Sequence, residues 1–156
     1  MTGEALPRIE ITEMYGRLNE GLIDLVEYIP DDKLEWSPRK DLWDLRHILA
    51  HVAFSRHNWT GNFLTQKIKP EDIHAAAATK AGIAEVLRES WARVLGFASD
   101  EANLDRQFEG ELAGQQYSYT GHWIYFHLLE HDIHHRADVF HYLALLGVEH
   151  PEVETP

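Results

Sequence analysis

The sequence of 156 residues contains no cysteine. This absence excludes disulfide bonds, thiolate metal ligands and a cysteine nucleophile. Any metal ion must therefore be held by nitrogen and oxygen atoms, from histidine and carboxylate side chains. A chain of this length can bury roughly two thirds of the surface that it exposes when unfolded, so it needs no covalent staple. We expect a single domain over residues 1–156.

Long apolar runs and an excess of basic residues are also missing. Residues 1–18 lack an apolar core of signal-peptide length, and charges or histidines interrupt every apolar stretch before it reaches the length of a membrane span. Fourteen basic against 26 acidic residues give a formal charge of −12, which repels phosphate backbones and anionic membranes. We expect a cytoplasmic protein that acts on a small-molecule substrate, with no nucleic-acid or membrane partner.

Apolar residues recur at helical spacing in four segments, which are residues 10–29, 44–66, 83–98 and 120–147. Asp44 is suited to cap the second helix, and Gly147 to end the fourth. Residues 67–79 show little periodicity, while the long segment 101–119 is either functional or contains a short hairpin. Four amphipathic helices without a convincing series of strands predict an all-α fold, an antiparallel-type four-helix bundle.

Six of the eleven histidines fall within residues 122–141, inside an apolar segment. His127, His131 and His135 recur every fourth residue, so they lie along one side of the fourth helix. A pair at this spacing can bind one divalent metal ion, with a third ligand from another helix and an open coordination position. His51 on the second helix can point toward the fourth, so we predict a metal site made by His51, His131 and His135.

Alternatives remain open at several histidines. His131 and His135 could instead be a hydrogen-bonded core pair, although burying two neutral imidazoles is costly. His127 could replace His131 as a ligand, but we expect it to line the pocket as a catalytic or hydrogen-bonding group. His47 also pairs with His51 by spacing, but it falls in the first helical turn, close to solvent.

The other histidines carry little signal. We expect His134 at an outer or interface position, and His57 and His74 at the surface, while His122 and His150 lie near helix ends. Three acidic residues, Glu130, Asp132 and Asp138, are candidates to accept a hydrogen bond from a ligating histidine, although Glu130 is more simply a solvated side chain. Five further residues could line or close the pocket: Ser55, Asn58, Tyr117, Tyr119 and Trp123.

Two segments carry a family resemblance. The first is Trp43-Asp-Leu-Arg-His-Ile-Leu-Ala-His51, and the second is His127-Leu-Leu-Glu-His-Asp-Ile-His-His-Arg136, followed by Tyr142-Leu143 and Gly147. Together they resemble the DinB/YfiT-like superfamily of metal-dependent enzymes. The resemblance implies an up-down-down-up four-helix bundle, usually a homodimer, with a divalent metal held by a histidine triad. By position that triad is His51, His131 and His135.

The resemblance also bears on activity. Relatives act mainly as transferases or isomerases that use low-molecular-weight thiols. This sequence departs from the family pattern at Asp44 and His47, in place of Ser/Thr and Glu, and at Ala137 and Asp138, in place of Gly and Gln. No departure touches a triad ligand, but the missing Gln leaves open any substrate contact that it makes.

Three functions therefore compete. The first is a thiol-dependent S-transferase, in which Zn²⁺, Ni²⁺ or a similar ion lowers the pKa of a low-molecular-weight thiol cosubstrate. The second is a metal-dependent hydrolase that activates water at the same site, with His127 as a general base. The third is a non-catalytic protein in which the metal or the histidine cluster has a structural role.

Overall fold

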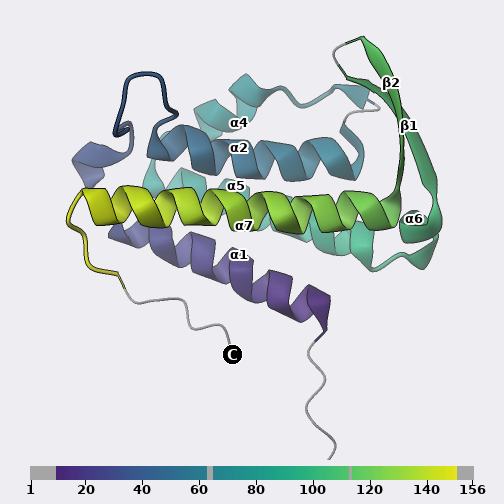
Figure 1. Cartoon of the computed structure of the whole chain (residues 1–156), viewed down its shortest axis with the longest axis horizontal. Helices are drawn as coiled ribbons and strands as arrows, with labels where there is room; N and C mark the ends of the chain where they lie inside the picture. The colour runs from purple at the N-terminus through teal and green to yellow at the C-terminus, as the bar shows by residue number, and fades with distance from the viewer. Residues whose placement is uncertain (1–9, 63–64, 113, 151–156) are drawn as a thin grey trace, which may run out of the picture.

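The computed structural model describes residues 10–62, 65–112 and 114–150, and it is mostly helical, as predicted for the all-α class (Figure 1). Its four long helices are α1 (Ile11–Tyr28), α2 (Leu45–His57), α5 (Lys80–Ala98) and α7 (Gly121–Leu145). Helices α5 and α7 each pack against both α1 and α2. In Figure 1, α7 crosses the front of the molecule between α1 and α2, and α5 lies behind it.

Side-chain caps fix where three of the four long helices, α2, α5 and α7, begin. The Asp44 carboxylate accepts a hydrogen bond from the backbone N–H of His47 at 2.7 Å, which confirms the predicted cap of α2. Thr120 caps α7 in the same way, by accepting from the Trp123 N–H at 3.1 Å. The other end of α7 is followed by Gly147, whose φ of 71° is the left-handed conformation that ends many helices.

The second helix is shorter than predicted. We expected it to reach residue 66, but α2 ends at His57 and a π-helical turn, η2 (Asn58–Asn62), follows. Gly61 in this turn has a φ of 138°, which a helix cannot continue through. The Asn62 side chain then accepts a hydrogen bond from the N–H of Ile68 and donates one to its carbonyl. These local polar contacts replace the helical ladder and turn the chain away.

Two segments predicted to be irregular, residues 67–79 and 101–119, contain short elements. The first of them contains α4 (Pro70–Ala76), which was not predicted. Residues 63–64, in the last part of the predicted second helix, lie outside the described residues. In the second segment, the structure has α6 (Glu101–Asp105) and an antiparallel hairpin of β1 (Gln107–Leu112) and β2 (Gln115–Thr120), so the short-hairpin alternative is confirmed. A further short element, η1 (Asp31–Lys33), follows α1.

A layer of polar side chains divides the core. Leu22, Leu49, Leu87 and Leu143 belong to one cluster of buried apolar residues, while Tyr15, Val94 and Leu128 belong to a second. Between the clusters, each long helix contributes one buried polar residue: Asn19 from α1, Arg56 from α2, Ser90 from α5 and Asp132 from α7. The polar layer therefore crosses the whole core at the height of the histidine-rich part of α7.

None of the helices in the described part of the chain is both long enough and apolar enough to cross a lipid bilayer.

Candidate metal centre

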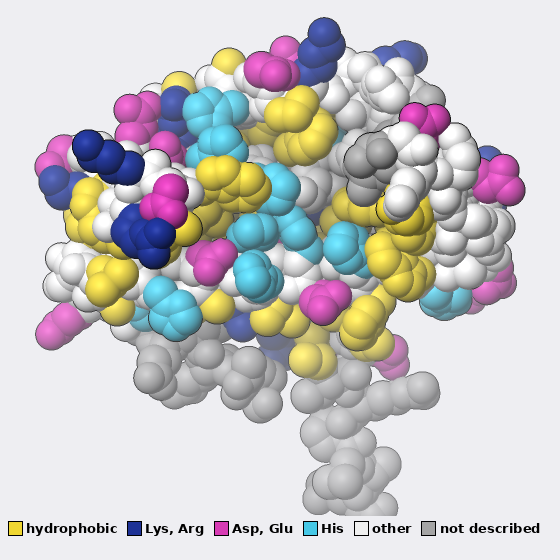
Figure 2. Space-filling view, turned by 45° about the horizontal axis from the view of Figure 1, so that its top comes forward, with side chains coloured by type: hydrophobic (Ala, Val, Ile, Leu, Met, Phe, Trp, Pro, Cys, Tyr) yellow, Lys and Arg dark blue, Asp and Glu magenta, His cyan; other side chains and the backbone are white. Residues whose placement is uncertain are grey.

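Helices α2 and α7 bring together the three histidines that the sequence singled out. His51, His131 and His135 each offer a ring nitrogen, and these atoms all lie within 4.8 Å of one another. The Nε2 atoms of His51 and His131 are 3.0 Å apart. Figure 2 shows histidine side chains gathered in the middle of one face of the molecule, with apolar side chains on either side. His127 does not belong to this group of converging nitrogens.

Carboxylates hold the far side of two of these rings. His131 Nδ1 lies 3.3 Å from Asp132 Oδ1, and His135 Nδ1 lies 3.1 Å from Asp138 Oδ2. Such contacts fix the tautomer with the proton on Nδ1 and leave Nε2 free to bind a metal ion. Both carboxylates were among the predicted partners, whereas Glu130 is exposed, in keeping with its interpretation as a solvated side chain.

The donor set fits a divalent ion. Two nitrogens bound to one zinc-like ion at tetrahedral geometry would be about 3.3 Å apart, because each Zn–N bond is about 2.0–2.1 Å long. The 3.0 Å between His51 and His131 is close to this spacing, so a small outward shift of the rings would accommodate an ion. Three imidazoles of this kind leave a fourth position for water or substrate, which is the pattern of catalytic rather than structural zinc sites.

The surroundings favour the neutral form of two of these rings, His51 and His135. Burial, followed by the neighbouring His131 and His135, lowers the pKa of His51 to about 4. Burial and His131 also lower the pKa of His135, although Asp138 opposes this shift. Because a metal ion competes with protons for the same nitrogens, a depressed pKa makes these ligands available at neutral pH.

A buried ion pair lies directly beneath His131. The side chains of Asp132 and Arg56 are both fully buried, and Arg56 Nε donates to Asp132 Oδ2 at 2.8 Å. Tyr15 donates its hydroxyl hydrogen to the same oxygen at 2.6 Å. Burial alone would raise the pKa of Asp132, but the Arg56 charge and the hydrogen bonds from His131, Tyr15 and Arg56 together lower it. Asp132 is therefore an anion that faces His131 with one oxygen and the core with the other.

The polar layer of the core surrounds the arginine of this pair. Arg56 Nη1 donates to Asn19 Oδ1 at 2.7 Å and to the carbonyl oxygen of Leu87 at 3.1 Å. The guanidinium also lies over the Trp91 ring, 5.9 Å from its centroid. The sequence prediction missed Arg56. A signal was present, however, because Arg56 continues the apolar series Leu45, Leu49 and Val52 at core-facing spacing.

An aromatic wall borders the site on the side of His127. The His127 ring is stacked on Trp123 with 4.8 Å between centroids, and Trp59 meets it edge-on at 5.1 Å. Its centroid is 6.2 Å from that of His131. Burial and His131 lower the pKa of His127, so it is a neutral ring at neutral pH. It therefore lies next to the three converging histidines, and its predicted pocket role stays a prediction.

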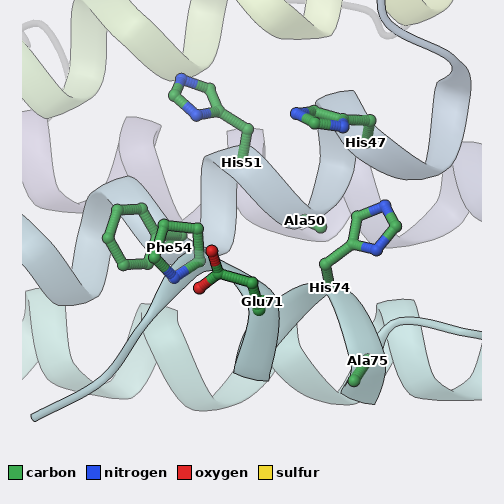
Figure 3. Close-up of a pocket in the computed structure, with 8 residues that line it drawn as sticks. His47, Ala50, His51, Phe54, Glu71, His74 and Ala75 are labelled. Atoms are coloured by element: carbon green, nitrogen blue, oxygen red, sulfur yellow. The ribbon is translucent and has the colours of Figure 1, made fainter.

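Trp43 and a cavity border the site on the opposite side. The Trp43 ring lies 4.7 Å from both His47 and His51 by centroid distance. A cavity of about 380 Å³ opens between α2 and α4, and both His47 and His51 line it. Figure 3 shows His47 and His74 approaching each other from the two helices, while His51 points away from α4. The wall is otherwise mainly apolar, so it can bind an organic group next to the metal ligands.

Structure and prediction differ at other histidines. His57, predicted at the surface, is buried, because it ends α2 against Arg56 and Arg93, and burial followed by these charges lowers its pKa. His74, also predicted at the surface, is half-buried because α4, which was not predicted, carries it into the cavity. His134 has an exposed side chain, as predicted, at 72% relative accessibility. It approaches Asp138 together with His135, and in this second cluster only His134 is exposed, whereas His135 and Asp138 are half-buried.

The predicted pocket residues divide between two places. Ser55 is buried, with its hydroxyl 3.4 Å from His51 Nε2, so it does lie beside the site. Trp123 also borders the site, through its stack on His127. Asn58, Tyr117 and Tyr119 instead line a separate cavity between η2 and the hairpin.

Comparisons with known proteins agree with this architecture. The model of the DinB family matches residues 5–156. The fold is similar to the crystal structure of a DinB-like protein from Bacillus subtilis, with a TM-score of 0.70 and 18% sequence identity. That similarity covers 94% of this chain and 99% of the other. No curated protein matches the sequence.

Proposed function

The chain belongs to the DinB family, and we propose that it is a divalent-metal-dependent enzyme whose metal ligands are His51, His131 and His135. The observation that carries this proposal is the convergence of three imidazoles from two helices, two of them held at Nδ1 by carboxylates. An ion bound there would lower the pKa of a thiol or a water molecule in the remaining coordination position. The most suitable reaction is transfer of a low-molecular-weight thiol to an electrophile.

The surroundings of the site support a thiol and an organic electrophile. The three ligands are uncharged, so they leave the full positive charge of the ion to stabilise a thiolate. The cavity beside His51 is large enough for a small organic molecule, and Ala50 and Phe54 contribute apolar wall. The Trp43 ring packs against the His51 ring, with 4.7 Å between centroids, and would restrict the access of water.

A hydrolase is the second candidate, and the position of His127 favours it. This neutral ring borders the site and could accept a proton from a water molecule. Assays of the metal-loaded protein with electrophilic and ester substrates, with and without a panel of low-molecular-weight thiols, separate the two reactions. Turnover that requires thiol supports the transferase. Turnover that ignores thiol, and that His127→Phe abolishes, supports the hydrolase.

Metal binding itself is tested separately from activity. Purified protein is loaded with Zn²⁺ or Ni²⁺, and the bound metal is measured by mass spectrometry for the wild type, His135→Ala and His134→Ala. We expect the His135 substitution to abolish stoichiometric binding and the exposed His134 control to retain it. Unchanged binding in His135→Ala would refute the triad. Metal binding without turnover on any substrate would indicate a structural role.

The arrangement of the long helices and the assembly complete the proposal. We propose that α1, α2, α5 and α7 form an up-down-down-up four-helix bundle, and the directions of the four helices in Figure 1 support this topology. We also propose a homodimer, because Phe126 and Ile133 on α7 are large apolar side chains with 64% and 45% exposure. Light scattering on the wild type and on Phe126→Ser tests the second proposal, with a monomeric wild type as the refuting result.

A further inference from the structure

A second cavity lies between η2 and the β-hairpin, apart from the three converging histidines. Its volume is about 200 Å³, and its walls include Trp59, Tyr117, Tyr119 and Glu111. Pockets for drug-sized ligands usually measure about 300–1,000 Å³. This cavity is therefore suited to a single small head group.

The aromatic walls meet at a corner. Trp59 and Tyr119 have ring planes at 86° and centroids 5.1 Å apart. Tyr117 and Tyr119 lie two residues apart on β2, so they share a face of the strand, and their rings are nearly parallel at 17°. The face of an aromatic ring carries negative potential and attracts cations. Trp123 also stacks on Tyr119, with 4.3 Å between centroids, so Tyr119 lies between two rings. Trp59 and Tyr117 are therefore the rings of this wall that can offer a face to a positively charged group.

An acidic side chain adds to this potential. Glu111 lines the cavity, and Gln116 across the hairpin donates a hydrogen bond to its Oε2 at 2.9 Å. That donor is a neutral amide, so it orients the carboxylate without cancelling its charge. No lysine or arginine is among the described residues that line the cavity, and the whole chain carries a formal charge of −12. The cavity therefore disfavours anions.

We propose that this cavity binds a small organic cation, such as a quaternary or alkylated ammonium group. A bare metal cation would need several oxygen ligands, whereas Glu111 is the only carboxylate among the described lining residues. A neutral apolar group would make no use of Glu111. An alkylated ammonium group can contact the rings of Trp59 and Tyr117 and at the same time be attracted by the carboxylate.

The cavity lies close to the proposed metal centre, but cation binding in the cavity does not depend on that centre. Trp59, which forms one wall, also contacts His127 at 5.1 Å between centroids. A ligand whose cationic end occupies the cavity would therefore have its other end near the histidine site. That extension rests on the proposed function, but binding of the cation itself does not.

The experiment is a titration of the full-length, metal-free protein with choline, followed by tryptophan fluorescence and by NMR at constant ionic strength. The comparison ligand is the dimethylbutanol analogue of choline, in which carbon replaces the ammonium nitrogen. We expect saturable binding of choline and at least fivefold weaker binding of the neutral analogue. Equal binding of the two ligands, or no saturable binding of choline, would overturn the proposal.

Variants locate the site. Glu111→Gln and Tyr117→Leu should each weaken choline binding by about three- to tenfold, because each removes one attractive wall. Glu109→Gln is the matched control, since it removes the same charge from β1 outside the cavity and should leave binding within about twofold. Equal effects of the two glutamate substitutions would indicate a diffuse field and refute the site. His135→Ala should bind choline normally, so failure of the metal proposal would not affect this result.

Discussion

Substitutions at Asp132 and Asp138 separate the contribution of the buried ion pair to stability from its effect on the proposed metal ligands. Each carboxylate contacts Nδ1 of one proposed ligand, at 3.3 Å from His131 and 3.1 Å from His135. Their surroundings differ, because the Asp132 side chain is fully buried whereas that of Asp138 is 37% exposed. Asp132→Asn and Asp138→Asn therefore remove the same charge from the same kind of contact, in two different dielectric environments.

The two substitutions should differ sharply in stability. Asp132→Asn leaves the Arg56 charge fully buried without its counter-ion, and breaking such a pair typically costs about 3–5 kcal/mol. Asp138→Asn breaks a partly solvated contact and should cost less than about 1 kcal/mol. Because small domains are stable by about 5–15 kcal/mol, the Asp132 variant should still fold, with a much lower unfolding midpoint.

Both substitutions should weaken metal binding. Loss of a carboxylate behind a ligating histidine typically reduces metal affinity by about 10–100-fold, because the ring loses its fixed orientation and some basicity. Urea unfolding in the presence of a chelator measures stability, and competition with a chromophoric chelator measures affinity. If Asp132→Asn unfolds at the same urea concentration as Asp138→Asn, the inference that the ion pair is energetically coupled to the core is wrong.

Three further predictions concern stability. Burial and neighbouring imidazoles lower the pKa of His51 in the folded protein to about 4, whereas a histidine in the unfolded chain has a pKa of about 6.5. Because the unfolded chain therefore binds a proton more readily than the folded protein, the free energy of unfolding should fall as the pH drops from about 6.5 toward 4. By about pH 5 the loss should be about 1–2 kcal/mol after allowance for partial exposure, and urea unfolding of metal-free His51→Ala should show a correspondingly smaller loss. In the same assay, Gly121→Ala should destabilise the protein by about 2–3 kcal/mol, because a Cβ there would overlap the backbone of Asn103. Gly96→Ala should stabilise the protein by up to about 1 kcal/mol, because Gly96 lies in α5 with open space around it. His57→Leu should be neutral or stabilising in thermal unfolding, because His57 Nδ1 is buried without a hydrogen-bond partner among the described residues, and a marked loss of stability would contradict this.

The convergence of the three histidines was largely predictable because their placement follows local rules. His131 and His135 are one turn apart, and helical geometry alone places them on one side of α7. His51 was predictable because it adjoins an apolar stripe that must face another helix. The helix starts at Asp44 and Thr120 were equally local, since a cap depends on one side chain and the first turn.

What could not be predicted depends on side-chain contacts and on a short helix that leave no period in the sequence. The end of α2 is fixed by Asn62 bonding to the backbone of Ile68, and no helical period records such a contact. The burial of His74 depends on α4, a helix of seven residues that is too short to show a clear period. From the sequence alone, Arg56 is interpreted as a surface charge, because its partner, Asp132 on α7, is 76 residues away.

The ion pair and the metal ligands place the same requirement on how α2 and α7 pack. Helix α2 contributes His51 and Arg56, and α7 contributes His131, His135 and Asp132, so each helix carries part of the proposed ligand set and one member of the ion pair. A shift of α7 by one turn would separate Arg56 from Asp132 and leave two buried charges unpaired, at a cost of several kcal/mol. Because Asp132 directly follows His131, the same shift would move His131 away from His51. Since His127, His131 and His135 are each one turn apart, such a shift would bring a different pair of histidines to His51. The buried pair therefore favours the one packing register in which His51 meets both His131 and His135, even before any metal ion binds.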